Sequence, residues 1–337
     1  MFSAFEWMMA LRYLRARRQE GFISVIAWFS LLGIMLGVAT LIIVMSVMNG
    51  FRQELLTRIL GVNGHLSVYA DTEKLTNYDG LALRVAKIDG VLKVTPMIEG
   101  QVMASANGQA KGAVVRGLRQ ADVLARPILA DNIRQGSIAN FKGKNAVMLG
   151  SRMARNLGLQ IGDKITLISP KGNVTAFGTV PRMKAYKVAA IFNVGMHEYD
   201  SSFIFMPLAA AQVYFKLPSA VSYLDVTIKK PNDAPYMARD VWQSLGNKGR
   251  VYDWQRTNSS FFNAIQVERN VMFLILTLII VVAAFNIISS LIMLVKDKGR
   301  DIAILRTMGA TRGMIMRVFL ISGASIGVIG TLAGFGL

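Results

Sequence analysis

Three long apolar runs stand out in a chain whose other segments alternate polar and apolar positions. They cover residues 22–48, 271–295 and 318–337, and none of them contains a charged residue. The hydrocarbon core of a bilayer is about 30 Å thick, so about 20 helical residues cross it. The pattern therefore predicts three transmembrane helices, joined by a long segment at 49–270 and a short one at 296–317.

A cleaved signal peptide is the alternative explanation of the first run, because Arg12, Arg15, Arg17 and Arg18 precede it. The run is, however, about twice the length of a signal-peptide core, and no small-residue cleavage site ends it. The sequence therefore favours a retained helix, preceded by an N-terminal segment at 1–21.

Basic residues predict the orientation of these helices. The 296–317 connection contains two acidic and six basic residues: Lys296, Lys298, Arg300, Arg306, Arg312 and Arg317. Short loops rich in lysine and arginine stay in the cytoplasm. We therefore expect 1–21 and 296–317 to be cytoplasmic and 49–270 to be periplasmic, in a multi-pass protein of the bacterial inner membrane. The third run ends without an anchoring flank, so we also expect a fourth helix beyond residue 337.

The long segment has the pattern of a folded domain. Alternating runs predict strands at 65–70, 97–105, 113–118, 165–169, 187–192, 202–206, 223–228 and 250–254. Asn107-Gly108 predicts a tight turn between the second and third of these strands. Helical periods occur at 81–88, 151–157, 208–215 and 234–245. We expect a mixed α+β domain with a membrane-near part at about 49–118 and 221–270 and an inserted part at about 119–220.

Residues 169–184 separate two of these strands and contain two prolines, two glycines and no apolar period. Loops of this length inside compact domains are usually functional. We therefore predict a functional loop here. The alternative is the ordinary tip of a β-hairpin.

A second candidate lies on the predicted cytoplasmic side, at 301–311. Residues 301–308 have helical character with Ile302, Leu305 and Met308 roughly along one face, and Gly309 follows. A short amphipathic helix of this kind could lie on the bilayer or dock into a soluble partner. A plain connector is the alternative.

Glycines at four-residue spacing mark predicted contacts between the membrane helices. The pairs are Gly33 with Gly37, Gly323 with Gly327, and Gly330 with Gly334. Small residues at this spacing let helix backbones approach closely in lipid. The alternative is the general enrichment of glycine in membrane helices.

Charge and missing motifs argue against nucleic-acid binding, enzymatic activity and metal binding. The formal net charge is +18, with 14 basic and three acidic residues between Lys111 and Lys187. On a membrane-tethered domain this favours anionic lipids or an acidic protein partner over nucleic acid. The chain has no cysteine, two histidines and no phosphate-binding loop, and the run from His197 to Asp200 is interpreted as a structural turn. We therefore expect a protein that is not an enzyme by itself, without a metal site.

Three stretches carry a family resemblance. They are ALRYLRARRQEGFISVIAWFSLLGIMLGVATLIIVMSVMNGFRQEL at 10–55, TAFGTVPRMKAYKVAAIFNVGMHEYDSSFIFMPL at 175–208, and VERNVMFLILTLIIVVAAFNIISSLIMLVKDKGRDIAILRTMGATRGMIMRVFLISG at 267–323. Together they resemble the permease subunits of lipoprotein-releasing ABC transporters, the LolC/LolE type. The third stretch is shared more loosely by the wider MacB/FtsX-like superfamily.

The resemblance implies four transmembrane helices and a periplasmic domain in two parts. It implies a complex with an ABC ATPase, which would hold ATP and Mg, and with a second permease subunit that is either another copy or a paralogue. No cofactor is expected on this chain itself. The complex would pass outer-membrane lipoproteins to a soluble periplasmic carrier. An FtsX-like transmitter or a MacB-like efflux permease is the alternative.

The resemblance also implies three sites. A carrier-binding hook would comprise Pro170, Lys171, Thr175, Ala176, Phe177, Gly178, Val180, Pro181, Arg182 and Lys184, with Ala176 where the family has proline. The basic residues of its flank, Lys171, Arg182 and Lys184, would steer an acidic partner. An ATPase-coupling helix would comprise Arg300, Asp301, Ile302, Ile304, Leu305, Arg306, Met308 and Gly309. A lipoprotein-facing surface would comprise Val44, Met48, Val271, Met272 and Ile275.

Overall fold

The computed structural model of the chain describes residues 4–14, 21–72, 74–175, 178–246 and 248–337. These fall into two compact units, Met1–Arg52 with Asn263–Leu337 and Gln53–Phe262. Three helices in the described part of the chain are long and apolar enough to cross a membrane: Leu31–Val62, Phe262–Met293 and Arg312–Gly336. They contain most of the three apolar runs, which confirms the predicted helices.

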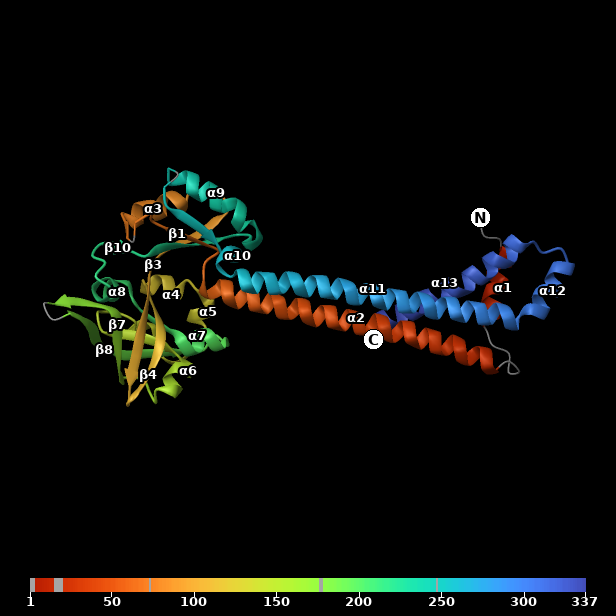
Figure 1. Cartoon of the computed structure of the whole chain (residues 1–337), viewed down its shortest axis with the longest axis horizontal. Helices are drawn as coiled ribbons and strands as arrows, with labels where there is room; N and C mark the ends of the chain where they lie inside the picture. The colour runs from red at the N-terminus through yellow and green to blue at the C-terminus, as the bar shows by residue number, and fades with distance from the viewer. Residues whose placement is uncertain (1–3, 15–20, 73, 176–177, 247) are drawn as a thin grey trace. The chain divides into compact units, whose positions relative to one another are not determined.

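The helices of the first unit and their extensions are α1 (Ala4–Leu14), α2 (Gly21–Val62), α11 (Ser259–Asp297), α12 (Gly299–Thr307) and α13 (Arg312–Gly336) (Figure 1). Helix α1 was not indicated by the apolar pattern. It packs on α13, where the Glu6 carboxylate is buried and lies 2.8 Å from Nε of Arg317. Ala10 is buried beside Val318 of α13. The N-terminal segment is therefore part of the helical unit.

Close helix packing accounts for only some of the paired glycines. A Cβ atom added to Gly334 would lie 2.5 Å from the Met35 carbonyl oxygen, and one added to Gly330 would lie 3.0 Å from Cγ2 of Ile34. These glycines let α13 approach the backbone of α2. At Gly37 and Gly327, in contrast, the nearest atoms are 3.6 and 3.9 Å away, which leaves ordinary van der Waals space.

We therefore expect Gly334→Ala to destabilise the helical unit by about 1–3 kcal/mol, because the backbone of α2 must move aside. Gly327→Ala is the matched control on the same helix, and it should be neutral or slightly stabilising since alanine is the better helix former. Thermal unfolding of the two variants in the same detergent measures the difference. Equal melting temperatures would show that close packing of α13 on α2 does not require glycine at position 334.

The second unit is built on a mixed sheet. Its strands are β1 (Leu66–Tyr69), β3 (Val91–Ala106), β4 (Gln109–Leu118), β5 (Ile133–Gly136), β6 (Ala146–Gly150), β7 (Lys164–Thr175), β8 (Gly178–Phe192), β9 (Phe203–Pro207), β11 (Tyr223–Ile228) and β12 (Arg250–Asp253). The pairing order is β12-β1-β11-β3-β4-β9-β6-β8-β5, and β7 pairs with both β3 and β8. Strands β2 (Leu75–Thr76) and β10 (Ala220–Val221) form a separate pair.

The pairing of β7 closes a ring of strands, β3-β4-β9-β6-β8-β7. Strand β3 belongs to this ring through its second half, whereas its first half pairs with β11. The turn between β3 and β4 is Asn107-Gly108, with φ of 50° and 75°. Two successive residues with positive φ are typical of the tight hairpin turn that this dipeptide predicts.

Helices complete the domain: α3 (Tyr78–Val85), α4 (Gln120–Leu124), α5 (Pro127–Ala130), α6 (Ser151–Asn156), α7 (His197–Ser202), α8 (Leu208–Tyr214), α9 (Ala234–Ser244) and α10 (Trp254–Thr257), with single 3-10 turns at Ile138–Asn140 and Pro231–Asp233. The main core continues from the antiparallel strands into the ring, and it includes Leu66, Val115, Leu167 and Ile204. Helices and strands are mixed, as predicted. The division into a membrane-near and an inserted part stays a prediction, because 53–262 forms one compact unit.

Candidate functional site

The segment expected to be an irregular loop is instead the outer part of a paired hairpin. Strands β7 and β8 are antiparallel, with Ser169 opposite Arg182 and, further out, Asn173 opposite Val180. The register shifts between these two pairs, where Pro170 and Pro181 lack the amide hydrogen that a ladder needs. Gly172 fits this bulge because a Cβ atom there would lie 2.1 Å from the Val180 carbonyl oxygen. The segment thus has the hairpin geometry of the alternative, and its functional role stays a prediction.

The predicted hook residues divide into three groups. Pro170, Val180 and Pro181 are exposed around the bulge. Lys171, Thr175 and Gly178 lie on the outer strands, where the structure describes the backbone and not the side chains. Ala176 and Phe177 lie outside the described residues, so the consequence of alanine at the tip stays a prediction.

Two residues expected to steer an acidic partner make contacts within the domain. The Arg182 guanidinium donates to the Tyr214 carbonyl oxygen. Nζ of Lys184 donates to the Lys144 carbonyl oxygen at 3.2 Å and lies 4.9 Å from the Tyr186 ring centre. The geometry therefore gives both side chains a local structural role.

An apolar row crosses the outer face of the sheet at the base of the hairpin. Met103 of β3 pairs with Ile168 of β7, and Ile168 pairs with Met183 of β8. Directly paired residues project from the same face of a sheet. Met103 is 50% exposed and Met183 63% exposed, with Ile168 between them partly covered. Methionine side chains adapt easily to different partners, so this row is suited to a docking surface.

The predicted coupling helix forms α12. Ile302, Leu305 and Met308 were expected along one face, and their exposure differs. Ile302 and Leu305 lie against α1 and α13, beside Met9 and Val318. Ile304 and Met308 are 59% and 79% exposed. Leu305 is half-buried, whereas Met308 on the same predicted face is exposed, and the docking role of Leu305 stays a prediction. Arg306 lies along the groove towards α11 and α13, and Arg300, Asp301 and Gly309 are exposed.

Local signals define both ends of α12. Nζ of Lys298 lies 3.6 Å from the Asp301 carboxylate in the first turn. Gly309 has a φ of 99°, and its amide donates to the Arg306 carbonyl, which ends the helix. Oγ1 of Thr311 then accepts from the amide of Met314 at 3.3 Å and caps α13. Short connections therefore join α12 to α11 before it and to α13 after it.

The residues expected to face the lipoprotein lie on α2 and α11. These helices are neighbours in the helical unit, where Gly37 of α2 lies against Ile279 of α11. Val44, Val271 and Ile275 are exposed, whereas Met48 and Met272 are partly covered. A common lipoprotein-binding surface formed by these five residues stays a prediction.

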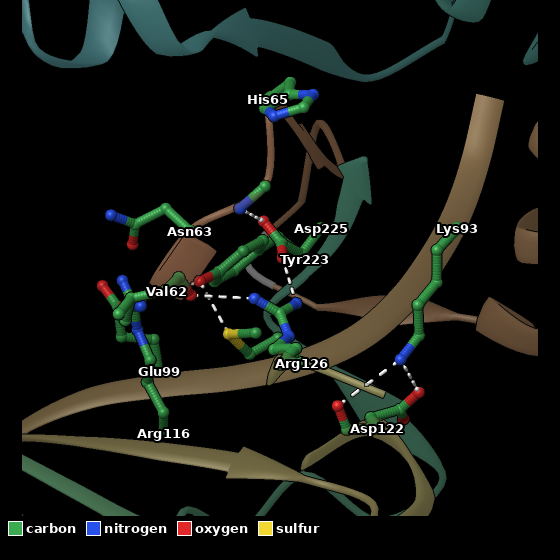
Figure 2. A network of polar contacts seen from close by, with 12 residues as sticks. Val62, Asn63, His65, Lys93, Glu99, Arg116, Asp122, Arg126, Tyr223 and Asp225 are labelled. Carbon is green, nitrogen blue, oxygen red and sulfur yellow. Dashed lines mark hydrogen bonds and ion pairs between the residues drawn. The ribbon is translucent and has the colours of Figure 1, made fainter. Parts of the chain in front are cut away.

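A buried ion pair that no sequence pattern indicated contacts the end of α2. The Arg126 guanidinium contacts the Asp225 carboxylate, and both side chains are buried. Nη1 of Arg126 also donates to the Val62 carbonyl oxygen at 2.8 Å, and Oδ1 of Asp225 accepts from the amide of Gly64 at 2.8 Å. Figure 2 shows the guanidinium between this carbonyl and the carboxylate. We call Arg126 and Asp225 the anchor pair.

The anchor pair provides a hydrogen-bond donor and a positive charge at the C-terminal end of α2. The last carbonyls of a helix lack partners within it, and the negative end of the helix dipole favours a cation nearby. Arg126 supplies both the donor and the charge. Further contacts fix the same end: Asn63 donates to the Tyr199 hydroxyl, and Nη1 of Arg58 donates to the Val194 carbonyl at 2.6 Å.

Other buried polar groups around this end have partners inside the domain, although Nη1 of Arg116 has none among the described residues. The amide of Ile228 donates to Nδ1 of His65, and burial lowers the pKa of His65. The Arg116 guanidinium lies 2.7 Å from the Glu99 carboxylate, which also accepts from the Tyr223 hydroxyl (Figure 2). Burial raises the pKa of Tyr223. These groups form a polar interior beside the anchor pair (Figure 2).

The run from His197 to Asp200 forms part of a short helix and not the turn that was interpreted from the sequence. It opens α7, and the Asp200 carboxylate accepts from the amides of Val194 and Gly195 at 2.9 and 3.1 Å. Burial raises the pKa of Asp200. Among the described residues, no group of three or more histidine, cysteine, aspartate or glutamate side chains could hold a metal ion.

Known proteins match the chain over nearly its whole length. The family model for the MacB-like periplasmic core domain matches residues 27–243, and that for the FtsX-like permease C-terminal matches 273–337. The lipoprotein-releasing system transmembrane protein LolC of Neisseria meningitidis is 37% identical over 337 residues, covering 99% of this chain and 81% of that protein. The chain belongs to the LolC/LolE family.

A second relative and a solved structure are also similar to the chain. The transmembrane protein LolE of Haemophilus influenzae is 30% identical, over 96% of this chain and 79% of its own length. The periplasmic region of MacB from Actinobacillus actinomycetemcomitans is 12% identical, covers 61% of this chain and 96% of that region, and has a TM-score of 0.41. Identity to both LolC and LolE proteins confirms the resemblance read from the three sequence stretches.

In this LolC/LolE family member, sequence reasoning missed the anchor pair and the apolar row. A carboxylate inside the apolar strand Tyr223–Ile228 is a signal that could have pointed to Asp225, since buried carboxylates are nearly always paired. Arg126 has no comparable local signal. Met103 could not be linked to Met183 without knowing that β7 lies between their strands.

Proposed function

We propose that this chain is the transmembrane subunit of an ATP-driven complex that releases lipoproteins from the inner membrane to a periplasmic carrier. The supporting observation is identity of 37% to a LolC protein over 99% of the chain, with the two family models in the order of a periplasmic domain and a membrane permease. ATP and Mg would bind the partner ATPase. A second permease subunit, a copy or a paralogue, would complete the membrane part.

The hairpin of β7 and β8 is our candidate for carrier binding. Its outer part extends beyond the bulge at Pro170 and Pro181, and the apolar row of Met103, Ile168 and Met183 lies at its base. A carrier that transports lipid-modified proteins must itself offer apolar surface. We therefore assign the hairpin and the apolar row together to carrier docking, and we assign no steering role to Arg182 or Lys184.

The outward face of α12 is our candidate for docking of the ATPase. Ile304 and Met308 present exposed apolar side chains between charged neighbours, as helix-in-groove contacts require. We expect Ile304→Asp to reduce co-purification of the ATPase subunit about tenfold or more, because a charge would enter an apolar contact. The measurement is the ratio of ATPase to permease after affinity purification of the complex.

Two controls separate docking from folding. Val213→Asp changes a similarly exposed residue of α8 and should leave the ATPase ratio unchanged. Leu305→Asp should instead lower the melting temperature of the isolated chain, because Leu305 packs against α1 and α13. A wild-type ATPase ratio in the Ile304→Asp variant would refute the assignment of this face.

Depletion of the chain in its host tests the proposed function in the cell. We expect outer-membrane lipoproteins to accumulate in the inner-membrane fraction within a few generations, and the full-length gene to restore their sorting. An FtsX-like transmitter would leave lipoprotein sorting intact and disturb cell-wall hydrolysis. Unchanged sorting after complete depletion would therefore exclude the proposal.

A further inference from the structure

A groove on the surface of the second unit lies between α9 and β12, and it has no role in the sites described above. Its volume is about 500 Å³. Arg239 of α9, Arg250 of β12 and Arg256 of α10 line it, and Trp242 and Tyr252 contribute aromatic side chains. All three arginines are exposed, and none of the described residues that line the groove is acidic. The groove is therefore basic and partly aromatic, and it is formed within one compact unit.

Carboxylates in the neighbouring segments leave the charge of the groove uncompensated. Oδ1 of Asp253 accepts from the amide of Arg256 at 2.9 Å and caps α10. Oδ2 of Asp71 accepts from the amide of Gly249 at 2.9 Å. Asp240 of α9 is exposed and does not line the groove. Within the described part of the chain, no ion pair joins any of the three arginines to a carboxylate.

The groove follows the open edge of a β-sheet. Strand β12 ends the pairing order and pairs with β1 on one side, and no further strand lies beside it among the described residues. Residues 249–252 all line the groove. Successive side chains of a strand point to opposite faces, so a groove that touches all four residues runs along the edge of the strand. An edge of this kind offers the backbone amides and carbonyls of every second residue to another chain.

The side chain of Trp242 fixes one wall of the groove beside this edge. Its Nε1 donates to the Gly249 carbonyl oxygen at 3.2 Å, and the residue stays 39% exposed. Helix α9 is therefore held next to the start of β12, and the indole ring offers apolar surface to a ligand. Because this wall is already formed, a ligand would not have to order it on binding.

We propose that an extended acidic segment of a partner protein binds in this groove along the open edge of β12. The planar guanidinium group matches a carboxylate with paired hydrogen bonds, and an added strand gains main-chain hydrogen bonds from a free sheet edge. A phosphate or a lipid headgroup would use the arginines and leave the strand edge unused. The family model that matches the domain is that of a periplasmic core domain, where nucleic acid is not an expected partner. The site uses neither the hairpin nor α12, so it is independent of carrier and ATPase binding.

The test begins with a library of random short peptides, selected for binding to the complete chain in a neutral detergent at low salt. We expect the enriched peptides to be rich in carboxylates. A labelled representative peptide, measured by fluorescence anisotropy, should bind about tenfold or more weakly when its Asp and Glu are changed to Asn and Gln, and its affinity should fall as salt is added. Methylation of alternate backbone amides should weaken binding for one of the two alternate sets and not for the other, since only every second amide of an added strand faces its neighbour.

Two triple variants decide whether the groove is the site. The variant Arg239→Gln, Arg250→Gln, Arg256→Gln should bind the peptide about tenfold or more weakly, while the ATPase still co-purifies. The control Arg134→Gln, Lys142→Gln, Arg155→Gln removes three exposed basic residues outside the groove and should bind the peptide as the wild type does. Replacement of the three groove arginines by lysine keeps the charge and should retain part of the affinity.

Several results would overturn the proposal. Selection without enrichment of carboxylates, or equal affinity of the wild type and the glutamine variant, would show that the groove does not bind an acidic segment. Equal effects of the two sets of methylated amides would exclude pairing with the strand edge. Competition by short-chain phosphatidylglycerol as strong as that of the unlabelled peptide would assign the groove to a lipid instead.

Discussion

Asp225→Asn should destabilise the periplasmic domain by about 3–5 kcal/mol, the usual result of removing one partner of a buried ion pair. The substitution keeps the shape of the side chain and leaves the Arg126 guanidinium buried without a counter-charge. It also weakens the bond from the amide of Gly64. Hydrogen exchange of the last turn of α2 and thermal unfolding in detergent measure the loss.

The loss of stability should come from breaking the buried pair, and removal of an exposed carboxylate charge should have little effect. Glu54→Gln is the matched control, because it removes the exposed partner of Arg58 on the same helix, and exposed pairs contribute about 0–1 kcal/mol. The double variant Arg126→Met, Asp225→Asn should recover part of the stability lost in Asp225→Asn, since no buried charge remains. If the double variant is no more stable than the single one, the anchor pair does not act as a unit.

Removing the outer hairpin should abolish capture of the periplasmic carrier while the ATPase still co-purifies. The deletion that the structure suggests covers residues 170–181, with Ser169 and Arg182 joined through an Asn-Gly turn. Ser169 and Arg182 are paired before the bulge, so the base of the hairpin and the Arg182 contact with Tyr214 are kept. Asn-Gly is the preferred dipeptide for a two-residue turn. Carrier pull-down from detergent measures the expected loss of about tenfold or more.

The apolar row at the base of the hairpin provides a finer test of the same site. Met183→Ser should weaken carrier capture, because it removes an exposed apolar side chain next to Ile168. Leu92→Ser is the matched control: Leu92 lies on β3 and is 60% exposed, against 63% for Met183. Undiminished capture after both the deletion and Met183→Ser would move the carrier site away from the hairpin.

Features with a local signal were predicted well from the sequence. Uninterrupted apolar runs located the membrane helices, and Asn107-Gly108 located the turn between β3 and β4. Both patterns depend on neighbouring residues only. The extent of β7 and β8 was missed for the same reason, because prolines and glycines hid strands that are paired across a bulge.

Features that depend on distant contacts could not be predicted. Arg126 and Asp225 are 99 residues apart in the chain, and neither position shows which partner will neutralise it. The inward orientation of Leu305 depends on α1, whose packing on α13 joins residues 311 positions apart in the contact of Glu6 with Arg317. The sequence therefore predicted which segments form the candidate sites. Which side chains of each segment are exposed could be seen only in the structure.

Reconstitution tests the proposed function most directly. The complete chain, its ATPase partner and a second permease subunit would be placed in liposomes with a labelled lipoprotein, and soluble carrier would be added outside. We predict that ATP moves the lipoprotein into the soluble fraction bound to the carrier, and that omission of either ATP or this chain prevents the transfer. ATP hydrolysis stimulated by this chain without transfer of lipoprotein to the carrier would contradict the proposed function.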